Sequence, residues 1–190
     1  MALDLTAPAA ELARLSARVR DDQLGDPTPC ADIDVSGMVA HMIGFSTAFR
    51  DGAAKVSGPT TSTPPGPMPL PEDWREQLPL LAGQLAAAWQ DPAAWEGETT
   101  VGGVTMPAAS HGGFANDELV LHGWDLAMAT GQAYAPAEAN LQAVWELVSG
   151  IPDSPDARRG FFGPRLPVAD DAPLLDRVLA YAGRDPHWTP

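Results

Sequence analysis

The chain contains little cysteine and few basic residues. Its 190 residues include one cysteine, Cys30, and 11 Lys and Arg against 25 Asp and Glu. A single cysteine excludes an intramolecular disulfide and a cysteine-based zinc knuckle, and it is typical of the reducing cytoplasm. The net charge of −14 argues against nucleic acid and anionic membrane surfaces as partners, because both select for clusters of Lys and Arg.

Long hydrophobic runs are also missing. No stretch approaches 18 apolar residues, and the N-terminus lacks a basic segment followed by an apolar one, so neither a transmembrane helix nor a signal peptide is expected. There is no internal repeat, no heptad pattern and no glycine-rich phosphate loop. We therefore expect residues 1–190 to form a single cytoplasmic domain with one buried core.

Apolar residues recur at helical spacing through most of the chain. The pattern predicts helices over residues 8–20, 34–55, 72–90, 113–130, 138–148 and 173–182, with Asp34 capping the second and Gly131 ending the fourth. Residues 58–71 are proline-rich and are predicted to form an extended surface loop, while Thr99–Met106 reads as a short hairpin or irregular loop. The predicted fold is all-α, a four-helix bundle with additional short helices and a Pro-rich loop.

One polar stripe interrupts the apolar pattern of the 113–130 helix. Glu118 and His122 are four residues apart, so they share a helix face one turn apart, and Asp125 lies three residues further on. Charged side chains in an apolar setting need a partner. A divalent metal is one natural partner, and a buried ion pair or hydrogen-bond network is the other.

A second candidate ligand, His41, lies in the amphipathic segment that Met38, Met42 and Phe45 define. It is either a core histidine bonded to a backbone carbonyl or a metal ligand. His41, Glu118 and His122 together would supply three ligands and leave a fourth position open, which is typical of catalytic rather than structural zinc.

Three motifs occur in order along the chain. They are Thr28-Pro29-Cys30 leading into the His41 segment, Glu118-x3-His122-Gly-Trp-Asp125 leading to Gly131, and Gly183-Arg184-Asp185-Pro186-x-Trp188 near the end. Together they resemble an actinobacterial family related to the metal-binding domain of mycothiol-dependent maleylpyruvate isomerase, within the DinB/YfiT-like superfamily. The resemblance covers almost the whole chain.

The resemblance implies a DinB-like bundle that holds a divalent metal, zinc or nickel, through His41, Glu118 and His122. The chain departs from the family pattern after Cys30, where Asp34 stands at the cap position in place of threonine. The isomerase also carries a C-terminal domain that contributes substrate contacts, and this chain ends at Pro190. Maleylpyruvate isomerisation is therefore not carried over.

The residues support thiol chemistry at the open metal position, because a coordinated thiol is deprotonated. We expect a transferase that joins a low-molecular-weight thiol, such as mycothiol, to a small electrophilic molecule. Asp125 has two possible roles. It either orients His122, or it is a carboxylate that lies on the helix surface or forms a hydrogen bond to another helix. The alternatives are a non-catalytic metal- or ligand-binding bundle and a metal-assisted hydrolase. The sequence assigns no catalytic residue and names no substrate.

The remaining polar and aromatic candidates are expected to have ordinary structural roles. His111 is predicted to be an exposed loop residue and His187 to be solvated, while Arg158 and Arg159 read either as anion-binding residues or as surface charges. Cys30 has no base near it in sequence and reads as a small buried hydrophobe, and Trp124 reads as core. Four further tryptophans predict a homodimer through an apolar bundle face. They are Trp74, Trp89, Trp95 and Trp145.

Overall fold

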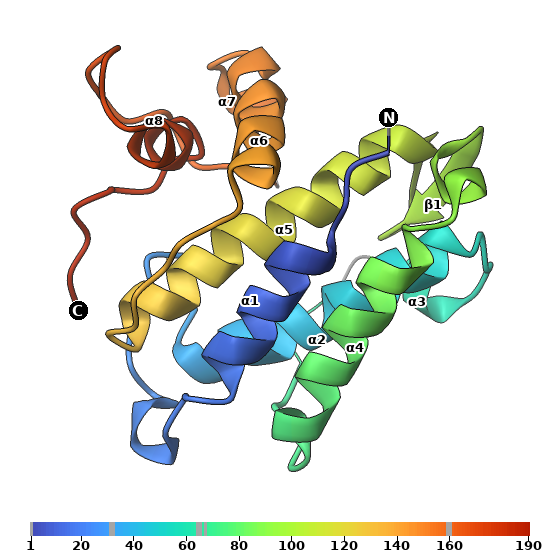
Figure 1. Cartoon of the computed structure of the whole chain (residues 1–190), viewed down its shortest axis with the longest axis horizontal. Coiled ribbons are helices and arrows are strands. Elements are labelled where there is room, and N and C mark those ends of the chain that lie inside the picture. The colour runs from blue at the N-terminus through green and yellow to red at the C-terminus, as the bar shows by residue number, and fades with distance from the viewer. Residues whose placement is uncertain (1, 31–32, 64–65, 67, 159–160) are drawn as a thin grey trace.

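Four helices pack side by side around one apolar core (Figure 1). The computed structural model describes residues 2–30, 33–63, 66, 68–158 and 161–190. The bundle helices are α1 (Thr6–Ser16), α2 (Val35–Ala53), α4 (Trp74–Ala88) and α5 (Ala108–Ala129). The predicted all-α bundle is confirmed.

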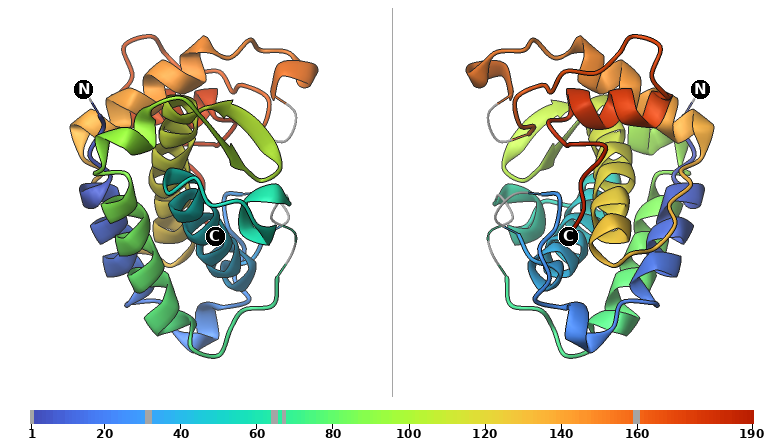
Figure 2. Two further views of the ribbon diagram at one scale, coloured as in Figure 1. Left: turned by 90° about the vertical axis from the view of Figure 1, so that its right-hand side faces the viewer. Right: turned by 90° about the vertical axis from the view of Figure 1, so that its left-hand side faces the viewer.

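The remaining elements are short or lie outside the bundle. Helices α6 (Glu138–Gly150), α7 (Pro155–Arg158) and α8 (Leu174–Tyr181) lie on the side of α5 that faces away from α4 (Figures 1 and 2). The short pieces are α3 (Pro59–Ser62), the 3₁₀ turns Asp21–Gln23 and Pro92–Trp95, and the strands β1 (Glu98–Val101) and β2 (Val104–Pro107). No helix in the described part of the chain is long and apolar enough to cross a membrane.

Helix α5 is buried on two sides, and this arrangement decides where its polar residues lie. Leu119 and Leu126 belong to the bundle core, whereas Val120 and Trp124 belong to a second apolar cluster formed with α6 and α8. The prediction that Trp124 packs in the core is confirmed, since it is 3% exposed. The polar stripe of α5 runs between these two apolar faces.

The ends of several helices differ from the predicted ones. Helix α1 begins at Thr6 rather than residue 8. The Asp4 carboxylate accepts the Thr6 N–H at 2.8 Å and so satisfies one N–H of the first turn. Proline is tolerated in a first helical turn, where the N–H has no intrahelical acceptor. The predicted extended loop of residues 58–71 contains helix α3, which starts with Pro59 in the first helical position.

The cap of α2 is confirmed, because Asp34 Oδ1 accepts the Gly37 N–H at 2.7 Å. This cap fixes the start of the helix that carries His41. The hairpin is also confirmed, and it packs on the other end of α2. Thr99 Oγ1 donates to the Gly52 carbonyl at 2.6 Å. A Cβ on Gly52 would lie 2.5 Å from Val101 Cγ2, so glycine permits this close approach.

We expect the substitution Gly112→Ala to destabilise the protein by about 1–3 kcal/mol, because added volume in a packed core forces neighbours to move. An alanine Cβ at this position would lie 2.4 Å from a ring carbon of Trp95 and 2.9 Å from one of Trp89. A Cβ added to the adjacent Gly113 would have no atom within 4 Å. Gly113→Ala should therefore stabilise α5 by up to about 1 kcal/mol, as alanine does in a helix interior.

Chemical denaturation of the two single variants measures this difference. Equal changes in the free energy of unfolding would contradict the packing of the two indole rings against α5.

Candidate metal centre

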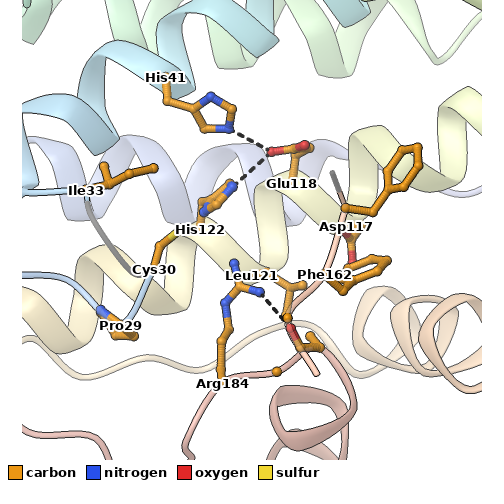
Figure 3. Close-up of a pocket in the computed structure, with 14 residues that line it drawn as sticks. Pro29, Cys30, Ile33, His41, Asp117, Glu118, Leu121, His122, Phe162 and Arg184 are labelled. Atoms are coloured by element: carbon orange, nitrogen blue, oxygen red, sulfur yellow. Dashed lines mark hydrogen bonds and ion pairs between the residues drawn. The ribbon is translucent and has the colours of Figure 1, made fainter. Parts of the chain in front are cut away.

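Three side chains from two helices meet at one point (Figure 3). Glu118 Oε2 lies 3.2 Å from His41 Nε2 and 3.1 Å from His122 Nε2. One potential ligand atom from each of the three residues lies within 4.8 Å of the others. The two imidazole rings are 4.8 Å apart, and Phe45 stacks against His122. His41, predicted from a separate segment 77 residues away, is therefore brought beside the Glu118–His122 pair.

The electrostatics of this cluster favour a protonated imidazole beside a carboxylate. Burial alone would raise the pKa of Glu118, but hydrogen bonds from His122 and His41 hold it well below its usual range. Burial would lower the pKa of His122, but hydrogen bonds to Asp125 and Glu118 raise it to about 9. Without a metal, a proton on His122 offsets the negative charge of Glu118. A cation bound here would replace that proton.

Asp125 is a buried partner of His122 and not a surface carboxylate. Its side chain is 0% exposed, and Oδ2 lies 2.9 Å from His122 Nδ1. This contact engages Nδ1, so Nε2 is the nitrogen that faces Glu118 and His41. Arg184 holds the same carboxylate with two bonds, from Nε to Oδ1 at 2.9 Å and from Nη2 to Oδ2 at 2.8 Å. Burial would raise the pKa of Asp125, but the Arg184 charge lowers it.

Arg184 is a site residue that the sequence argument did not identify. It follows the end of α8, where Gly183 has a φ of +81° and a Cβ would lie 2.6 Å from Gly163 Cα. Only glycine combines that left-handed conformation with such a close approach. The Gly183-Arg184 pair in the third motif could have pointed to Arg184. The neighbouring sequence, however, does not indicate that its partner is Asp125.

A cavity of about 390 Å³, which we call the polar cavity because charged side chains form part of its wall, opens beside the three residues. Its lining is Pro29, Cys30, Ile33, His41, Asp117, Glu118, Leu121, His122, Phe161, Phe162, Gly163, Ala182, Gly183 and Arg184. The interpretation of Cys30 as a small buried hydrophobe is confirmed in part, because it is partly buried and packs against the bundle core. The residue is half-buried on the cavity wall, with its sulfur within 4.8 Å of ligand atoms of His122 and Asp125. The fold brings together groups that are more than 90 residues apart.

Asp117 is a second residue of this cavity that sequence reasoning missed. It is 6% exposed, and its Oδ1 has no hydrogen-bond partner among the described residues. Burial, with the neighbouring charge of Glu118, raises the pKa of Asp117 to about 8. A buried oxygen without a partner is costly, so it is suited to accept a hydrogen bond from a bound molecule.

The expectation that His111 is an exposed loop residue is wrong. Helix α5 begins at Ala108, earlier than predicted, so His111 lies in its first turn and is 3% exposed. Its Nε2 lies 3.1 Å from the Val104 carbonyl of the hairpin, and burial lowers its pKa. Pairing with the hairpin requires tertiary structure, which the local sequence does not show.

The other candidates are placed as follows. His187 is exposed, as predicted. Arg158 is 3% exposed and donates to the carbonyls of Gly163 and Tyr181, so its interpretation as a surface charge is wrong. Arg159 lies outside the described residues.

The four tryptophans from which a homodimer was predicted all pack against other residues of the same chain. Trp74 and Trp89 are 3% and 1% exposed, Trp95 packs edge-on against Trp89, and Trp145 packs against Tyr181. The homodimer stays a prediction, but the buried Trp74 and Trp89 cannot supply its apolar face.

In the metal-free protein, we expect the titration of His122 by itself to lower the free energy of unfolding by up to about 3 kcal/mol as the pH rises from about 6.5 to about 9. The pKa of His122 is about 9 in the folded chain against a model value of 6.5. The folded state therefore binds a proton that the unfolded state has lost, and this contribution disappears as the pH rises through 9. The pKa of Asp117 is raised to about 8, so its titration also lowers the free energy of unfolding as the pH rises toward 8.

Urea denaturation with a chelator present measures this slope. The variant His122→Gln is the control, and its stability should fall less over the same interval. A wild-type stability that rises toward pH 9 would contradict the proposed charge state.

Comparison with known proteins connects this geometry to a family. The family model described as the mycothiol maleylpyruvate isomerase N-terminal domain matches residues 5–127. Two uncharacterized proteins of Mycobacterium tuberculosis, from strains CDC 1551 and ATCC 25618, are each 30% identical over 90% of this chain and 91% of their own length.

Two solved structures have a similar fold. They are the mycothiol-dependent maleylpyruvate isomerase and an alanine mutant of it, with TM-scores of 0.55 and 0.58 over 74% of this chain. The sequence identity is 18%, so this likeness establishes the fold alone. The chain spans 65% of the length of those isomerase chains.

Proposed function

Because the chain belongs to the family of the mycothiol maleylpyruvate isomerase N-terminal domain, we propose that it is a divalent-metal-dependent transferase. It would join a low-molecular-weight thiol, mycothiol, to a small electrophilic molecule. The observation that carries this proposal is the convergence of His41, Glu118 and His122 at the wall of an open polar cavity.

The donor set fits a divalent ion of the zinc or nickel type. Two imidazole nitrogens and one carboxylate oxygen are ligands that such ions accept, and three protein ligands leave a position open. Ligand atoms about 2.1 Å from a tetrahedral ion are about 3.4 Å apart. The separations of 3.1 and 3.2 Å between Glu118 and the two imidazoles are close to that value.

An ion of this type would supply one chemical function, which is to keep a coordinated thiol deprotonated. The chain's own residues supply the rest. Asp125 orients the His122 ring through Nδ1, and Arg184 holds Asp125 by hydrogen bonds to its carboxylate. Asp117 presents a buried oxygen that can accept a hydrogen bond from a polar group of the thiol compound. The cavity offers room for that polar portion beside the ligands.

The net reaction joins the thiol sulfur to an electrophilic carbon. In a substitution, the sulfur electron pair forms the S–C bond, the leaving group departs with its bonding pair, and the thiol proton passes to solvent. The reaction needs no oxidant or reductant.

Purified protein, quantified for metal and then assayed with mycothiol and a panel of electrophiles, tests the proposal. We expect about one divalent ion per chain and turnover that requires both the ion and the thiol. Thiol-independent hydrolysis would favour the hydrolase alternative. Tight binding of ion and thiol without turnover of any electrophile would favour a non-catalytic binding protein.

A further inference from the structure

A second cavity, which the preceding proposal does not use, adjoins two of the three candidate ligands, His41 and Glu118. It has a volume of about 400 Å³ and shares His41, Glu118 and Phe161 with the polar cavity. The polar cavity extends along α5 from Glu118 toward Leu121 and His122, whereas the second extends toward Phe114 and His111. The two cavities therefore meet at the candidate metal ligands and lead away from them in different directions.

Most of the residues that line the second cavity are apolar. Phe45 and Phe49 come from α2, Val101 and Met106 from the hairpin, and Phe114 from α5. The hairpin is held against α2 by the close approach of Val101 to Gly52, so this wall is a packed part of the fold. Phe161 stacks on Phe114 with ring centroids 5.3 Å apart. An aromatic or branched hydrocarbon group would find complementary surfaces here.

The charges around this cavity disfavour an anion. No Arg or Lys occurs among the described residues that line it, and its acidic residue is Glu118. The pKa of His111 is lowered by burial, and the ring faces the Val104 carbonyl, so it offers no positive charge. In the metal-free protein, a carboxylate placed here would lose its hydration beside the Glu118 carboxylate without gaining an Arg or Lys partner.

We propose that this apolar cavity binds the electrophile and that the electrophile is an uncharged compound with an aromatic or branched hydrocarbon portion. That the ligand is the electrophile of the reaction rests on the proposed thiol-transfer function. The selection against anions rests on the residues that line the cavity. The polar thiol compound then occupies the cavity that contains Asp117 and Arg184, and its sulfur meets the electrophile beside His41 and Glu118.

Nitrobenzene and benzoate make a matched pair of probes, since the nitro group and the carboxylate have the same planar shape and differ in charge. Calorimetric titration into metal-free protein without thiol should show nitrobenzene binding at least about tenfold more tightly than benzoate, because only the anion must be desolvated without a partner. In proton NMR, nitrobenzene should shift the ring signals of His111 but not those of the exposed His187.

The variant Val104→Lys tests the role of charge at the cavity wall. Val104 lines the cavity and is 46% exposed, so a lysine there can be accommodated, and it should shift the preference about tenfold or more toward benzoate. Val56→Lys is the control, because Val56 is 51% exposed and lines neither cavity. It should leave both affinities unchanged.

Three results would overturn the proposal. They are benzoate binding to the wild type as tightly as nitrobenzene, nitrobenzene leaving the His111 signals unmoved, and identical effects of the two lysine variants. Nitrobenzene binding as described without thiol transfer to any uncharged electrophile would count against the transferase function while supporting the cavity's selectivity. Thiol transfer restricted to anionic electrophiles would support the function and reject the cavity assignment.

Discussion

Replacement of His122 by alanine is expected to abolish stoichiometric divalent-metal binding. The substitution removes one of three proposed ligands, and it also removes the imidazole that Asp125 orients at 2.9 Å. Two remaining ligands from different helices, His41 and Glu118, would hold an ion far more weakly. Metal analysis after dialysis, together with calorimetric titration of Zn²⁺, measures the loss.

The bundle should stay folded in this variant. Its core is apolar and independent of the site, unlike that of a zinc finger, whose folding needs the metal. Circular dichroism should therefore be unchanged. His187→Ala is the matched control, since this histidine is exposed and lies away from the cluster. Retention of one tightly bound ion by the His122 variant would contradict the ligand assignment, and the thiol chemistry proposed from it would lose its basis.

Replacement of Arg184 by leucine is expected to cost about 3–5 kcal/mol of stability, because it leaves a buried carboxylate without its cation. Asp125 is 0% exposed and Arg184 is 9% exposed. Asp125 would keep only its contact with His122. Chemical denaturation measures the change, and metal affinity should fall as well, because the orientation of His122 depends on this carboxylate.

A surface pair of the same chemistry is the control for this effect. Arg20 and Asp22 form an ion pair at 2.9 Å with side chains 64% and 72% exposed. Exposed pairs contribute about 0–1 kcal/mol, so Arg20→Leu should have little effect. The double variant Asp125→Asn with Arg184→Leu should recover part of the loss, since it removes the buried charge. A loss for Arg184→Leu no larger than that for Arg20→Leu would refute the structural importance of the pair.

The bundle was predictable from sequence because its signals are local. The spacing of Met38, Met42 and Phe45 indicates an amphipathic helix whatever the rest of the chain does. Asp34 indicates the start of that helix through a bond to an N–H three residues later. The limits of α5 were less predictable. Its first turn, including His111, is stabilised by the hairpin and by a tryptophan pair packed on Gly112.

The same distinction between local and distant contacts applies to the site. Glu118 and His122 face one another because the helix repeat places residues i and i+4 on one side, so this pair is predictable from the sequence alone. Only the packing of distant segments pairs Asp125 with Arg184, places Cys30 beside His122 and sets an apolar cavity next to the polar one. These contacts join segments tens of residues apart, and they depend on how α8 and the hairpin pack against the bundle. The spacing of neighbouring residues in the sequence does not predict that packing.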